Sequence, residues 1–136
     1  MRSSKDVESY LMRMGRPFEV IAGEGEVTEA TTWITHTSGV PVALILQVPL
    51  VVARVEIGKL PAAGTKAREP LFEHLLRLNA TSLVHACYGL DGETIVLTAT
   101  AELENLDYNE LDAVFIDIDL ALAQHLPRIR ELANAA

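Results

Sequence analysis

Two side chains in this sequence have the types and spacing of a nucleophilic site: His85 and the single cysteine, Cys87. If both lie on a β-strand they point to the same face, since side chains alternate along a strand. A catalytic thiolate also needs a third group that orients the imidazole. Pairing the flanking strands around Asp91-Gly92 puts Thr98 opposite His85 and places no acid or amide nearby. We therefore expect an inert cysteine, and an enzyme that uses the His85/Cys87 face is the alternative.

The other residues with chemical potential do not form a recognisable site. The histidines contain no HxH or HxxxH pair, which argues against a metal centre. Gly23-Glu-Gly25 lacks a following Lys-Ser/Thr and does not open a helix, so it is not a phosphate loop. Glu102 and Glu104 would share a face, but acids at a sheet edge commonly discourage aggregation. We expect no catalytic residue, metal or cofactor. The four histidines are His36, His74, His85 and His125.

The composition is that of one globular domain spanning residues 1–136, with 49% apolar and 22% charged residues. A chain of this length can bury roughly two-thirds of its unfolded surface, so it needs no metal or disulfide to form a core. The N-terminus has no apolar signal region, and the longest apolar stretch, residues 40–53, falls short of the roughly 20 residues that span a bilayer. With one free thiol, these features predict a cytoplasmic protein.

The charge is acidic and unevenly placed. Eleven basic and nineteen acidic residues give a net charge of −8, which argues against binding to nucleic acid or to an anionic membrane. Residues 1–88 hold nine of each sign, whereas residues 89–136 hold two basic and ten acidic residues. Two interpretations remain open. The acids form a solvated helix face, or they attract a basic segment of a partner.

In the first half, apolar spacing predicts a helix over residues 5–14, capped by Ser3 or Ser4, and an extended segment over 18–22. Residues 31–37 and 40–48 form a hairpin around Ser38-Gly39, with Trp33 opposite Leu44 and Thr35 opposite Val42. Because residues 40–48 are apolar on both faces, we expect a central strand that is covered on both sides. Extended structure can resume over residues 51–57.

A second helix, over residues 70–79, is apolar over more than half of its circumference. One packing contact does not account for so wide an arc, so we expect the helix to contribute to a dimer interface. The residues of this candidate interface are Leu71, Phe72, Leu75, Leu76 and Leu78.

The second half of the chain predicts a hairpin and a long last helix. Residues 83–88 and 94–102 pair around Asp91-Gly92, which puts Tyr88 opposite Ile95 and Ala86 opposite Leu97. The last helix has Asp107 as its N-cap, and Pro127 makes it kink or restart.

The last helix has a second apolar stripe on the side opposite its core residues. At 100° per residue, Ile116 and Leu120 lie away from the core stripe, and Asp112 and Asp119 flank them. An apolar pair rimmed by carboxylates suits a partner segment that carries Lys or Arg. We take Ile116, Leu120, Asp112 and Asp119 as a candidate partner-binding surface.

The predicted order is α-β-β-β-α-β-β-α, an α+β domain in which helices flank an antiparallel sheet. Three segments in the second half carry a family resemblance. They are Pro70-Leu-Phe-Glu-His-Leu-Leu-Arg-Leu-Asn79, Tyr88-Gly-Leu-Asp-Gly-Glu-Thr-Ile-Val-Leu97 and Glu104-Asn-Leu-Asp-Tyr-Asn-Glu-Leu111. With this order, the chain resembles the YbjN-like and type III secretion chaperone-like superfamily, of which the Tir chaperones are one branch.

The resemblance implies a small, acidic, cytoplasmic homodimer without enzymatic activity. It would hold an extended segment of a partner protein against exposed apolar patches. The YbjN-like branch implies an alternative, a regulatory adaptor in sensory or stress signalling whose partner is a folded protein. The sequence does not identify the partner.

Overall fold

The computed structural model describes residues 1–22 and 31–135 of the chain, so the predicted turn at Gly23-Glu-Gly25 lies outside the described residues. The helices are α1 (Ser4–Arg13), α2 (Arg68–Thr81), α3 (Tyr108–Gln124) and α4 (Leu126–Ala133). The strands are β1 (Glu19–Ala22), β2 (Thr31–Thr37), β3 (Val40–Gln47), β4 (Leu50–Lys59), β5 (Ala86–Asp91) and β6 (Thr94–Glu102).

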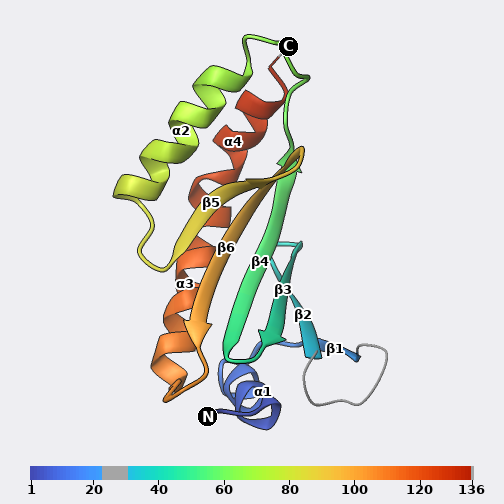
Figure 1. Cartoon of the computed structure of the whole chain (residues 1–136), viewed down its shortest axis with the longest axis vertical. Helices are drawn as coiled ribbons and strands as arrows, with labels where there is room; N and C mark the ends of the chain where they lie inside the picture. The colour runs from blue at the N-terminus through green and yellow to red at the C-terminus, as the bar shows by residue number, and fades with distance from the viewer. Residues whose placement is uncertain (23–30, 136) are drawn as a thin grey trace.

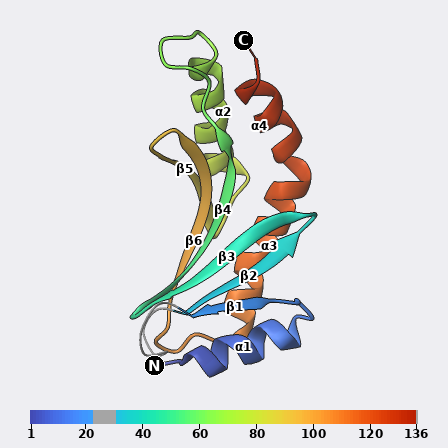
Figure 2. The same ribbon diagram turned by 90° about the vertical axis from the view of Figure 1, so that its right-hand side faces the viewer.

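The six strands form one antiparallel sheet in the order β1-β2-β3-β4-β6-β5. The two longest strands, β4 and β6, pair along their whole length, from Leu50 opposite Glu102 to Lys59 opposite Thr94. Figure 1 shows α1 at one end of these strands and α2 beside α4 at the other. Figure 2 shows β1, β2 and β3 crossing α3, while β4 and β6 extend on towards α2.

A single apolar core lies between the sheet and the helices. Every second residue of β2, β3 and β4 is buried, and the apolar stripe of α3 packs over them. Trp33, the largest core side chain, is fully buried, and its indole Nε1 donates to Glu8 Oε1 on α1 at 3.0 Å. Burial of these stripes on both elements accounts for the α+β architecture.

The sequence-based prediction of the fold class is confirmed. Two local predictions are confirmed with it. Trp33 stands opposite Leu44 and Thr35 opposite Val42 in the β2–β3 hairpin. Ser3 and Asp107 cap α1 and α3, where their side chains accept the backbone N–H of Asp6 at 3.4 Å and of Glu110 at 2.8 Å.

The structure adds a fourth strand before α2 and a fourth helix to the predicted order. The extended structure predicted over residues 51–57 is the strand β4, which spans residues 50–59. At the other end, Pro127 lies in the first turn of α4, where its missing N–H removes no helical hydrogen bond. The chain therefore restarts as α4 directly after α3.

The predicted register of the second hairpin was wrong by two residues. Tyr88 stands opposite Leu97 and Asp91 opposite Thr94, so the two-residue loop is Gly92-Glu93. Gly92 has a φ of 58° and occupies the first loop position, where a type II′ turn places glycine. Because the shift is an even number of residues, each side chain keeps its predicted face.

The prediction that residues 40–48 are covered on both sides was also wrong. β3 lies inside the sheet, but only Val42, Leu44 and Leu46 are buried. On its other face, Ala43 and Ile45 are half-buried. The helices pack on one face of the sheet, so an apolar run on β3 does not require a second layer.

Candidate partner-binding surfaces

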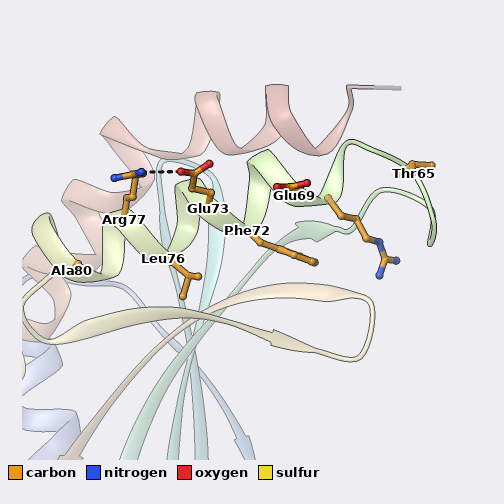
Figure 3. Close-up of a pocket in the computed structure, with 8 residues that line it drawn as sticks. Thr65, Glu69, Phe72, Glu73, Leu76, Arg77 and Ala80 are labelled. Carbon is orange, nitrogen blue, oxygen red and sulfur yellow. Dashed lines mark hydrogen bonds and ion pairs between the residues drawn. The ribbon is translucent and has the colours of Figure 1, made fainter.

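The first candidate surface is the exposed side of α2. Leu71 and Leu75 are buried in the core and Leu78 is half-buried against it, whereas Leu76 is 68% exposed. Phe72 is half-buried on the same side as Leu76, and Figure 3 shows both side chains on the side of α2 that faces the β5–β6 hairpin. The structure thus divides the predicted apolar arc between the core and an open face.

An apolar groove runs between α2 and the edge strand β5. Its volume is about 280 Å³, and Leu90, which is 49% exposed, forms its outer wall on β5. On the other side of Phe72 and Leu76, a shallower hollow continues along α2 to the Glu73–Arg77 ion pair, in which the Nη2–Oε1 distance is 2.8 Å (Figure 3). The groove residues are Phe72, Leu75, Leu76, Asn79, Tyr88, Gly89 and Leu90.

The second candidate surface is the outer face of α3. Ile116 and Leu120 are each 49% exposed, as expected for a stripe opposite the core. Asp112 beside them is half-buried and has no ion pair with another described residue. These three side chains therefore remain together on an accessible face.

Asp119, the fourth predicted member of that surface, already has partners within the chain. Its Oδ2 lies 2.6 Å from Arg16 Nη2, and its Oδ1 accepts from Thr37 Oγ1 at 3.0 Å. The Arg16 guanidinium also lies 4.5 Å from the centre of the Phe115 ring. Asp119 thus joins the segment after α1 to β2 and α3, and its charge is partly neutralised by Arg16.

Asp117 is a structural residue that sequence reasoning missed. It is buried, and its Oδ2 accepts the backbone N–H of Val84 at 3.2 Å, of His85 at 2.9 Å and of Ala86 at 2.8 Å. A carboxylate that accepts several backbone N–H groups fixes the path of that segment. At 100° per residue Asp117 lies well outside the predicted core stripe, so the helical periodicity gave no signal of its buried role.

A polar contact links β5 to the junction of α3 and α4. Tyr88 Oη lies 3.0 Å from His125 Nδ1 at that junction. Burial raises the pKa of Tyr88, and the charge of Asp117 raises it further. Burial lowers the pKa of His125, and nearby His74 adds to this effect, although Asp117 opposes it. Both shifts of the pKa favour the neutral form of the group.

The structure does not assemble the predicted His85/Cys87 pair into a nucleophilic site. Thr98 stands opposite Cys87 rather than His85, with 3.8 Å between Sγ and Oγ1. His85 precedes β5, and Asp117 accepts its backbone N–H instead of orienting its ring. Both His85 and Cys87 are exposed, so the environment is that of a solvated surface.

The remaining chemical candidates are dispersed in the described part of the chain. Glu104 lies 3.6 Å from the amino group of Met1, and Glu102 ends β6 on the surface. Residues 1–22 and 31–135 contain no cluster of three His, Cys, Asp or Glu side chains that could hold a metal ion. Within the same residues, no helix is both long and apolar enough to cross a membrane.

Comparison with known proteins gives a family match and several structural matches. The CesT_Tir_1 family model, which represents type III secretion chaperones, matches residues 1–135. The type III secretion chaperone SycH of Yersinia pestis, solved with a stable fragment of YscM2, gives a TM-score of 0.56 at 17% identity. That match covers 88% of this chain and 97% of the other.

Two further structures share the fold. A chain of the HopA1–SchA chaperone-effector complex has a TM-score of 0.56 at 10% identity and covers 96% of this chain and 92% of its own. A chain of the heterodimeric ExoU–SpcU complex, from the type III secretion system of Pseudomonas aeruginosa, has a TM-score of 0.55 at 15% identity, with coverages of 94% and 98%. No curated protein sequence matches the chain.

Proposed function

Because the chain belongs to the CesT_Tir_1 family of type III secretion chaperones, we propose that it is a cytoplasmic homodimer that holds a segment of a partner protein. The observation that carries this proposal is the family match over residues 1–135. The structures that share its fold support a partner-binding role, since SycH and the HopA1–SchA complex were solved with a protein partner.

The dimer is proposed to form on α2. Leu71 and Leu75 are used in the core of one chain, which leaves Leu76 and Phe72 as its apolar contacts. A second copy would bury these two side chains and Leu90 across the groove. Removing this apolar area from water would drive the association.

The partner segment is proposed to bind on the outer face of α3. Ile116 and Leu120 supply apolar contacts, and Asp112 supplies a negative charge that this chain leaves unpaired among the described residues. Asp119 is retained in the proposal as a rim residue, although Arg16 partly neutralises it. An apolar segment with one or more Lys or Arg residues is complementary to this face.

A pull-down from the native lysate followed by limited proteolysis tests the function. A chaperone should protect one contiguous fragment of an otherwise digestible partner, because it holds an extended segment. A regulatory adaptor should instead retain an intact folded domain, and that result would contradict the proposal.

The double variant Ile116→Ser/Leu120→Ser should recover less partner while keeping its fold and mass. The variant Met12→Ser, which alters an apolar side chain that is 67% exposed on α1, is the control.

A further inference from the structure

The sheet has two edge strands, β1 and β5. Backbone groups on the outer edge of β5 form hydrogen bonds with side chains of α2 and α3. Tyr88 lies in the middle of β5, with its backbone N–H and C=O pointing away from β6. Its N–H donates to Asn79 Oδ1 at 2.7 Å, and its carbonyl accepts from Asn79 Nδ2 at 3.0 Å. These are the two bonds that a facing residue of an added antiparallel strand would form.

Asp117 occupies the next outward position on the same edge. Outward groups recur at every second residue of an edge strand, so Ala86 and Leu90 point the same way as Tyr88. The Ala86 N–H donates to Asp117 Oδ2 at 2.8 Å. The backbone groups of Leu90 have no side-chain partner among the described residues. Of the three outward positions on β5, two are therefore bonded to α2 or α3.

We infer that Asn79 and Asp117 close the β5 edge against strand addition, so that a protein which docks beside α2 binds through side chains only. Exposed strand edges invite pairing with other chains, and natural sheets protect them by covering or blocking the edge. Here the blocking group is an amide that reproduces both backbone bonds of a neighbouring strand. Asp has no donor for the Tyr88 carbonyl, and Ala has neither group.

The closed edge determines how the α2–β5 groove can be used. Asn79 and Tyr88 both line the groove, beside Phe72, Leu76 and Leu90. A segment in this groove meets apolar side chains over a backbone that is already paired. These hydrogen bonds close the edge whether or not the protein is a chaperone.

Amide hydrogen exchange of the wild-type protein gives the first test. If the edge is closed, the amides of Ala86 and Tyr88 exchange at least about tenfold more slowly than that of Leu90, although all three point outward. In Asn79→Ala, the Tyr88 amide alone should lose this protection while Ala86 keeps it. Equal exchange of Tyr88 and Leu90 in the wild type would overturn the inference without any variant.

Self-association gives the second test. Once Asn79→Ala frees Tyr88, two copies can pair antiparallel with Tyr88 of each facing Leu90 of the other, which forms four backbone hydrogen bonds. In the Leu76→Ser background, which removes an apolar contact of the proposed α2 dimer, light scattering should then give at least twice the mass of Leu76→Ser alone at the same concentration. In the same background Asn79→Asp should keep the mass of Leu76→Ser alone, because it retains the acceptor and adds a charge at the edge. Asn109→Ala, at an exposed position of α3, is the matched control. A folded Leu76→Ser/Asn79→Ala variant with the mass of Leu76→Ser alone from 1 to 200 µM, roughly the range that edge pairing needs, would overturn the inference.

Discussion

At Asp117, one carboxylate supplies hydrogen-bond partners to three consecutive backbone amides of the segment that leads from α2 into β5. These N–H groups have no partner within a helix or a strand ladder, so they need an acceptor from elsewhere. The acceptor comes from the middle of α3, more than 30 residues further along the chain.

Removal of this carboxylate should destabilise the whole domain. Asp117→Ala leaves the Ala86 N–H buried without an acceptor, and we expect a loss of about 3 kcal/mol in the free energy of unfolding. Urea denaturation followed by circular dichroism measures the loss. Asp112→Ala removes a carboxylate of the same helix that has no ion pair with the residues described by the structure, and it should cost less than about 0.5 kcal/mol. Equal midpoints for the two variants would show that the three bonds contribute little.

The contact between Tyr88 and His125 predicts a pH dependence of stability. The pKa of His125 is lowered in the folded state, mainly by burial and also by His74, and Asp117 only partly offsets this. As the pH falls through the ordinary histidine pKa of about 6.5, the unfolded chain takes up the proton first, so the folded state loses stability. The loss continues until the pH passes the folded-state pKa.

Urea midpoints at pH 7.5 and pH 5.5, which bracket the ordinary histidine pKa of about 6.5, measure this effect. The wild-type midpoint should be lower at pH 5.5, and His125→Gln should show a smaller difference between the two conditions. His36→Gln changes an exposed histidine on β2 and should behave as the wild type does. If His125→Gln retained the full wild-type difference, the titrating group would be another residue.

At the scale of single elements, the start of α3 depends on its cap. Asp107 accepts the Glu110 N–H at 2.8 Å, which satisfies one of the donors that a helix N-terminus leaves unpaired. We expect Asp107→Ala to lower the unfolding free energy by about 1 kcal/mol. Asn109→Ala, inside the same first turn, should have almost no effect. Thermal unfolding of the two variants under identical conditions provides the comparison.

Elements defined by neighbouring residues could be predicted from the sequence, because their signals are local. The Ser38-Gly39 turn fixed the pairing of β2 with β3, and the caps at Ser3 and Asp107 followed from their side chains. The register of the β5–β6 hairpin was predicted wrongly because the sequence favours Asp91-Gly92 as the two-residue loop. In the structure the loop is Gly92-Glu93, and Gly92 takes its first position.

The candidate sites were harder to predict, because they depend on contacts between distant segments. The apolar arc of α2 was recognised, but only packing separates Leu71 and Leu75, which are buried, from Leu76, which is exposed. Asp119 looked like a free rim charge until the fold placed Arg16 beside it. Arg16 and Asp119 are 103 residues apart in the chain, so no local sequence pattern indicates that they form an ion pair.

At the scale of the whole molecule, the proposed dimer gives a direct prediction. Leu76→Ser should weaken self-association about tenfold, since it removes one large apolar side chain from the interface. Light scattering over a concentration series measures the dissociation constant. Met12→Ser is the matched control, because Met12 and Leu76 have nearly equal exposure, 67% and 68%. A wild-type mass of one chain at micromolar concentration would exclude the dimer, and an equal effect of both variants would place it elsewhere.

Because β4 pairs with β6, the sheet cannot be completed until late in the synthesis of the chain. Strands β1 to β4 are neighbours in sequence, so they can form a meander as soon as they leave the ribosome. Strand β6 is synthesised only after residues 60–93, so its pairing with β4 must close a long loop. Until β6 and α3 arrive, the buried side of the meander faces water. The nascent chain is therefore most prone to misassociation while residues 60–124 are being synthesised.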